Sequence, residues 1–273
     1  MASNNAPKKT GNFVLTAEAL NEALPKFHFG TQAVHADDFV SSHRAIAPAM
    51  HPAVNHRYAR DPDDLVEMEK DDPNAPPDPH VYPRYTAPNP SRSEIVLKTL
   101  FGTSVVSYSS GLSAFHAMLV LVNPEEIFLT EGYHGVHGVI DVISKLNGLK
   151  RLSLDNIDEM AQATCSTARA VGAILTVDST FGPPPLQDPL QFGADMVMHS
   201  GTKYIGGHSD MLCGMVAIHP DRVREGYEEA LREERLVLGS AMGSLEGWLG
   251  IRSLRTLHLR GRRQAKTTEC LVA

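Results

Sequence analysis

Short apolar runs alternate with segments of helical spacing between residues 91 and 218, and this alternation constrains the fold more than any other feature. The apolar runs predict strands at 105–108, 127–130, 173–177, 196–199 and 215–218. The helical spacing predicts helices at 91–100, 112–122, 139–146 and 156–170. The first helix is expected to carry a Ser91–Glu94 capping box, and the run 173–177 is expected to be a buried strand. Strands that alternate with helices predict an α/β fold with a mostly parallel sheet flanked by helices.

The chain is expected to divide into four parts. These are an N-terminal tail and helix (1–27), an extended N-terminal arm (28–90), an α/β domain (91–220) and a C-terminal part (221–273). Residues 1–11 are polar and are expected to be disordered, 12–24 have helical spacing, 63–70 favour a helical turn, and 221–260 read as helical. Five prolines within 71–83 predict an extended connection, either a domain linker or an arm that reaches a neighbouring subunit.

Composition excludes several classes of function. The net charge of −7 argues against a surface that binds nucleic acid, and no apolar run approaches the roughly 20 residues that cross a bilayer. The first residues lack the apolar stretch of a secretory signal. Cys165, Cys213 and Cys270 lie too far apart for a disulfide framework or a zinc pattern. We therefore expect a cytoplasmic protein with no contact to a membrane and no nucleic-acid partner.

Two segments near predicted strand ends carry candidate site residues. Asp178 follows the strand 173–177, where an acid can accept a hydrogen bond from a cationic ligand nitrogen or simply cap a turn. The strand 196–199 ends in Ser200, Thr202 and Lys203. Such a loop suits a phosphate, and its lysine can form a Schiff base with a carbonyl, although a solvated surface lysine is the commoner explanation.

Two further segments offer weaker candidates. Gly111 and Leu112 begin the helix 112–122 after a pair of serines, so their backbone N–H groups could bind a phosphate or the serines could only cap the helix. Tyr133 lies in the loop after 127–130 and could stack on a planar ring or pack as an ordinary tyrosine. The histidines have no acidic partners at metal-ligand spacing, so no metal site is expected.

Four of these candidates, Asp178, Ser200, Thr202 and Lys203, occur within one long motif. The stretch 177–217, VDSTFGPPPLQDPLQFGADMVMHSGTKYIGGHSDMLCGMVA, resembles the cofactor core of the Cys/Met metabolism enzymes that depend on pyridoxal 5'-phosphate (PLP). Weaker matches flank it at YPRYTAPNPSR (82–92), YSSGLSAFHAML (108–119), EGYHG (131–135) and WLGIRSLRTLHLR (248–260). The family includes cystathionine γ-synthase and the cystathionine β- and γ-lyases. The resemblance implies the type I fold of PLP-dependent, aminotransferase-like enzymes.

The resemblance implies a role for each candidate. Lys203 would hold PLP through a Schiff base and shuttle protons, and Asp178 would pair with the pyridine nitrogen. Ser200 and Thr202 would bind the phosphate through hydroxyl groups, and Gly111 and Leu112 would bind it through backbone N–H groups. Tyr133 would stack on the ring and assist the leaving group. Tyr82 and Arg84 would reach the phosphate held by a neighbouring subunit.

The implied activity is PLP-dependent transsulfuration, by β- or γ-elimination or γ-replacement on cystathionine-type amino acids in methionine biosynthesis and cysteine metabolism. The partners implied are a small amino-acid substrate and further copies of the chain, as a homodimer or homotetramer with shared active sites. The resemblance does not choose between a lyase and a synthase.

The sequence departs from the family pattern at three places. Arg84 and Asn89 lie five positions apart instead of three, which bears on the role of Tyr82 and Arg84. No family-type strand ending in an Asn-Pro motif is found between 152 and 170, and the C-terminal α+β domain is expected to be incomplete. Arg252, Arg255 and Arg260 do not match the family's carboxylate-binding arginine. The alternative is therefore a PLP-binding but catalytically impaired homologue or partner subunit.

Overall fold

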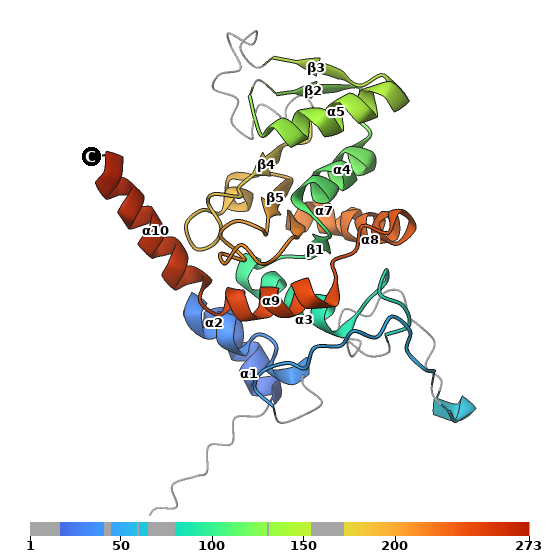
Figure 1. Ribbon diagram of the computed structural model, residues 1–273, viewed down its shortest axis with the longest axis vertical. Coiled ribbons are helices and arrows are strands. Elements are labelled where there is room, and N and C mark those ends of the chain that lie inside the picture. Colours follow the sequence, from blue (N-terminus) through green and yellow to red (C-terminus); the bar gives the residue numbers. More distant parts are fainter. Residues whose placement is uncertain are drawn as a thin grey trace, which may run out of the picture.

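The computed structural model describes residues 17–40, 45–58, 60–64, 80–129, 131–153 and 172–272. Its main sheet has four strands in the order β1-β6-β5-β4, and a second sheet pairs β2 with β3 (Figure 1). The strands are β1 (Val105–Tyr108), β2 (Glu126–Phe128), β3 (Lys150–Leu152), β4 (Thr176–Asp178), β5 (Met196–Ser200) and β6 (Gly214–Ile218). Strand β6 runs antiparallel to β1 and β5, whereas β4 runs parallel to β5 and β2 parallel to β3.

Helices precede, connect and follow these strands. The α-helices are α1 (Ala17–Ala23), α2 (Phe29–His35), α3 (Pro88–Phe101), α4 (Gly111–Val122), α5 (His134–Asn147), α7 (Pro220–Arg224), α8 (Tyr227–Leu238), α9 (Ser244–Leu254) and α10 (Leu257–Val272). Short 3-10 turns lie at Leu24–Lys26, Asp38–Val40, Pro62–Asp64 and Pro189–Phe192. The predicted α/β class with flanking helices is confirmed. None of the helices in the described ranges is long and apolar enough to span a membrane.

Two hydrophobic clusters cover the two faces of the main sheet. Alternate strand residues divide between them, so Val105 and Val197 face one cluster while Val106 and Met196 face the other. Helices α2, α3 and α9 contribute to the first cluster, and α4, α5 and α8 contribute to the second. Successive strand side chains point to opposite faces, so a sheet buried on both sides needs apolar runs without alternation. This explains why the runs 105–108, 196–199 and 215–218 predicted strands correctly.

Helices α3 and α9 lie side by side under the sheet (Figure 1). Gly247 permits this approach, because a Cβ at that position would lie 2.6 Å from the backbone of Asn89. The predicted Ser91–Glu94 capping box is wrong. Helix α3 begins at Pro88 after Ala87, which makes no side-chain cap, and Glu94 bonds to β1 instead. Proline suits the first turn of a helix because its missing N–H would have no partner there.

The predicted burial of the strand at 173–177 is also wrong. Strand β4 covers only Thr176–Asp178 and has exposed residues at both ends, because among the described residues it pairs with β5 on one side only. The β2–β3 pair forms a separate sheet within the described residues. The predicted helix at 156–170, the absent family strand and most of the helical turn at 63–70 concern residues outside the described ranges. The same holds for the polar tail 1–11.

Candidate functional site

Asp178 and Ser200 end neighbouring parallel strands and are joined through Thr180. The Thr180 backbone N–H and hydroxyl both donate to Asp178 Oδ1, at 3.0 and 2.5 Å, and its hydroxyl oxygen accepts from the Ser200 backbone N–H at 2.8 Å. Both bonds to the carboxylate use Oδ1, which leaves Oδ2 without a partner among the described residues. Asp178 is exposed, so this oxygen can accept a hydrogen bond from a ligand.

The turn after β5 carries Thr202 and Lys203. Its backbone is fixed internally, since Gly206 N–H donates to Gly201 and Gly207 N–H donates to Lys203 at 2.7 Å. Arg260 on α10 holds it from outside, donating to the carbonyls of Tyr204 and Ile205. The Thr202 hydroxyl is buried and has no partner within the described part of the chain. Lys203 is exposed on this turn, where its amine is accessible to a ligand.

The start of α4 lies against Ser200. The Ser110 hydroxyl caps the helix by accepting a hydrogen bond from the Ser113 N–H. The Ala114 N–H donates to the Ser110 carbonyl, so both of these N–H groups have local partners. The N–H groups of Gly111 and Leu112 have no partner among the described residues. A Cβ at position 111 would lie 3.0 Å from Ser200 Cβ and 3.2 Å from its Oγ. Only glycine therefore lets this helix start approach the strand end so closely.

Tyr133 lies immediately before α5 and is 57% exposed. A Cβ on Gly135 would meet the Tyr133 ring at 2.8 Å and the Leu112 side chain at 2.9 Å, so both lie beside the same glycine. The structure thus brings Tyr133 next to the start of α4. We define the cradle as Gly111, Leu112, Ser200 and Thr202, with Tyr133, Asp178 and Lys203 around it.

Arg84 contacts both Tyr82 and helix α8. The Arg84 guanidinium lies 5.0 Å from the centre of the Tyr82 ring and donates to the Leu236 carbonyl at 3.1 Å. Both side chains are exposed. Their role toward a neighbouring subunit stays a prediction.

A buried ion-pair network lies beside β1 at Ser107, and sequence reasoning missed it. Glu94 of α3 contacts Arg232 and Arg235 of α8 at 2.9 and 2.7 Å. Burial alone would raise the pKa of Glu94, but the two guanidinium groups and the Ser107 donors outweigh burial and lower it to about 2. The carboxylate is therefore ionised across the physiological range. Its partners lie about 140 residues away, so no local signal could identify them.

His199 is a buried side chain beside Ser200 in β5. Neither ring nitrogen has a partner among the described residues, and the ring packs against Phe101 with centroids 5.1 Å apart. Burial lowers its pKa to about 4 and outweighs the opposing effect of the nearby Ser179 backbone. The imidazole is thus neutral at physiological pH and serves as packing under the strand that carries the site.

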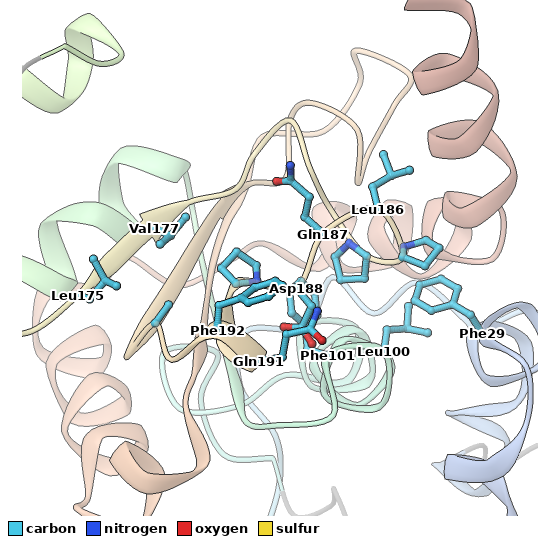
Figure 2. A pocket seen from close by; sticks show the side chains of 14 residues that line it. Phe29, Leu100, Phe101, Leu175, Val177, Leu186, Gln187, Asp188, Gln191 and Phe192 are labelled. Carbon is cyan, nitrogen blue, oxygen red and sulfur yellow. The ribbon is translucent and has the colours of Figure 1, made fainter. Parts of the chain in front are cut away.

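A cavity of about 690 Å³ lies elsewhere. Apolar side chains of β4, α3 and the segment 184–194 surround it, and Figure 2 shows Leu175, Val177 and Phe192 around it. None of the cradle residues lines it, and neither does Lys203 or Asp178. Its one carboxylate, Asp188, caps the turn at Leu190. We take the cradle as the candidate site, because Gly111 closely approaches Ser200 there and the Thr202 hydroxyl has no partner among the described residues.

Together these features define a class of α/β protein. A helix start with two amides free of partners among the described residues, two hydroxyl side chains, an exposed lysine and a strand-end carboxylate suit a phosphorylated cofactor that carries a carbonyl and a ring nitrogen. The buried Thr202 hydroxyl, which has no partner among the described residues, and the close approach of the helix start to Ser200 fit a phosphate.

The comparisons name the family. Residues 157–273 match the profile of the Cys/Met metabolism PLP-dependent enzymes, and the chain belongs to this family. It is 32% identical over 263 residues to the L-methionine gamma-lyase of Streptomyces avermitilis, covering 85% of this chain and 62% of that protein. It is 47% identical over 94 residues to the cystathionine gamma-synthase of Escherichia coli, covering 34% and 23%. The chain thus spans less than two thirds of these relatives.

Solved structures agree on the fold. A methionine gamma lyase from Micromonospora echinospora superimposes with a TM-score of 0.75 at 25% identity, covering 90% of this chain and 71% of that one. The yeast cystathionine gamma-lyase superimposes with a TM-score of 0.71 at 24% identity, covering 85% and 64%. The predicted type I fold and family are therefore confirmed, and PLP is the family's cofactor.

Proposed function

We propose that the chain binds PLP at the cradle and acts as a PLP-dependent transsulfuration enzyme on sulfur amino acids. The observation that carries the proposal is the close approach of Gly111 to Ser200, two residues before a buried Thr202 hydroxyl with no partner in the described chain. A phosphate there would accept hydrogen bonds from both amides of the helix start and from both hydroxyl groups.

The chain's own groups divide the chemical work. Lys203 would hold the cofactor covalently and, once released, would move a proton between substrate atoms. The free Oδ2 of Asp178 would accept a hydrogen bond from the ring nitrogen and keep that nitrogen protonated. When bound, PLP would supply an electron-accepting ring that stabilises negative charge on the substrate α-carbon. Tyr133, exposed beside Leu112, would stack on the ring and assist the leaving group.

The relatives that support a substrate class are named L-methionine gamma-lyase, cystathionine gamma-synthase and cystathionine beta-lyase. We propose a cystathionine-type amino acid as the substrate. Tyr82 and Arg84 would reach the phosphate of a neighbouring copy, which would make the working unit a homodimer or homotetramer.

One observation favours a second candidate, a PLP-binding but catalytically impaired homologue or partner subunit. Arg255 is engaged with Asp37 and with the carbonyls of Ala33 and Val34, and Arg260 is engaged with carbonyls around Lys203. Neither guanidinium is available to bind the α-carboxylate of a substrate.

The test is turnover by the full chain loaded with PLP. Cystathionine and methionine are supplied separately, and pyruvate, 2-oxobutanoate and free thiol are measured, with Lys203→Ala as the control. Product that depends on Lys203 supports the enzyme. Bound PLP without product supports the impaired homologue, and a chain that binds no PLP refutes both.

A further inference from the structure

We propose that Glu94 and Arg235 are positioning residues that set the geometry of the phosphate-binding start of α4 and tie it to the arm at Tyr85. This inference rests on the proposed function, because it assigns a purpose to the segment that would hold the PLP phosphate. Neither side chain touches the cradle. Each acts through Ser107, four residues before Gly111.

Ser107 has all three of its polar groups held by this pair. Its backbone N–H and hydroxyl donate to Glu94 Oε1 at 2.9 and 2.6 Å, and its carbonyl accepts from Arg235 at 2.9 Å. Glu94 and Arg235 contact each other at 2.7 Å. All three residues are buried, so these bonds are shielded from water and hold the end of β1 in one position.

The same arginine reaches the arm. Its second terminal nitrogen donates to the Tyr85 carbonyl at 3.1 Å, between Arg84 and the start of α3. On the other side, Ser109 N–H donates to the Ser240 carbonyl just after α8. The segment 107–109 is therefore fixed from α3 and α8 at once, and the helix start that follows it has little freedom to move.

A purely structural ion pair would stabilise the fold without affecting one ligand group more than another. Pyridoxal separates the two roles, since it carries the ring and aldehyde of PLP without the phosphate. A positioning role predicts that loss of Glu94 weakens PLP binding much more than pyridoxal binding. A structural role predicts equal effects on both.

The experiment compares Glu94→Gln with Glu228→Gln in the full chain. Glu228 is a matched control, because it also pairs with Arg232 but makes no bond to Ser107. Glu94→Gln should weaken PLP binding by about tenfold or more, the effect of losing one charge-assisted contact. Pyridoxal binding should change less than about threefold, and Glu228→Gln should change neither by more than about twofold.

Hydrogen exchange of the amides at 108–113 in the chain without ligand gives a readout that does not require PLP. Exchange should accelerate in Glu94→Gln and stay unchanged in Glu228→Gln. Ser107→Ala keeps the ion pair, so exchange at 108–113 should accelerate in this variant too, but by less. If Glu94→Gln does not fold, the exchange rate of Ser107→Ala tests the inference in its place. Unchanged exchange, or equal losses of PLP and pyridoxal affinity, overturns the inference. Failure of the wild-type chain to bind PLP refutes the proposed function instead, and the exchange result still stands.

Discussion

Replacing Thr202 by valine should stabilise the ligand-free chain and weaken PLP binding, two effects of opposite sign from one hydroxyl. In the free chain the buried Thr202 oxygen has no partner among the described residues. A buried hydroxyl without a hydrogen bond costs roughly 1–3 kcal/mol, and valine has nearly the same shape. We expect a gain of about 1 kcal/mol, which corresponds to roughly 2–4 °C in Tm for a chain of this size.

With PLP bound, the same hydroxyl would donate to the phosphate. Hydrogen bonds to charged groups contribute about 1.5–3 kcal/mol, so the PLP dissociation constant should rise by roughly tenfold to a hundredfold. Thermal unfolding and PLP titration measure the two effects. Thr103→Val is the matched control, because the Thr103 hydroxyl donates to the Ile218 carbonyl at 2.6 Å away from the cradle. It should lower Tm and leave PLP affinity unchanged. A destabilised Thr202→Val chain, or one with wild-type PLP affinity, refutes the reasoning.

Three further predictions concern other residues. Gly111→Ala should raise the PLP dissociation constant at least about tenfold in a titration, because the new Cβ would lie 3.0 Å from Ser200 and push the helix start away from the strand end. Burial raises the pKa of Glu234 from 4.5 to about 7, so stability should fall as pH rises between these values, and Glu234→Gln should flatten that fall in Tm. Asp37→Asn should cost about 3–5 kcal/mol in urea unfolding, since buried Asp37 holds Arg92 and Arg255; a loss below about 1 kcal/mol would contradict this.

Strands were predicted best where the local run of residues is enough to define them. Strand β1 was predicted with its observed bounds, and β5 and β6 within one residue at one end, because both faces of these strands are buried and their runs are mostly apolar. Strand β3 was missed, since two of its three residues are charged and both are exposed. Strand β4 was predicted as buried from the apolar run 173–177, which does not reveal that β4 pairs only with β5 among the described residues.

The residues of the cradle were predicted from strand ends, a helix start and one resemblance, and the structure brings Gly111, Ser200 and Tyr133 to the same edge of the sheet. The network that supports it was not predicted. Glu94 looked like a capping residue because Ser91 lies three positions before it, yet its partner Arg235 is 141 residues away. Long-range pairs of this kind depend on how helices pack, which short-range spacing does not encode.

The central claim is that Lys203 holds PLP at the cradle. Incubating the full chain with PLP, reducing it with borohydride and sequencing its peptides by mass spectrometry tests this claim directly. The account predicts that a single pyridoxyl group is found on the peptide containing Lys203 and that Lys203→Ala carries none. Label spread over several exposed lysines, or label that persists at the same level in Lys203→Ala, would contradict it.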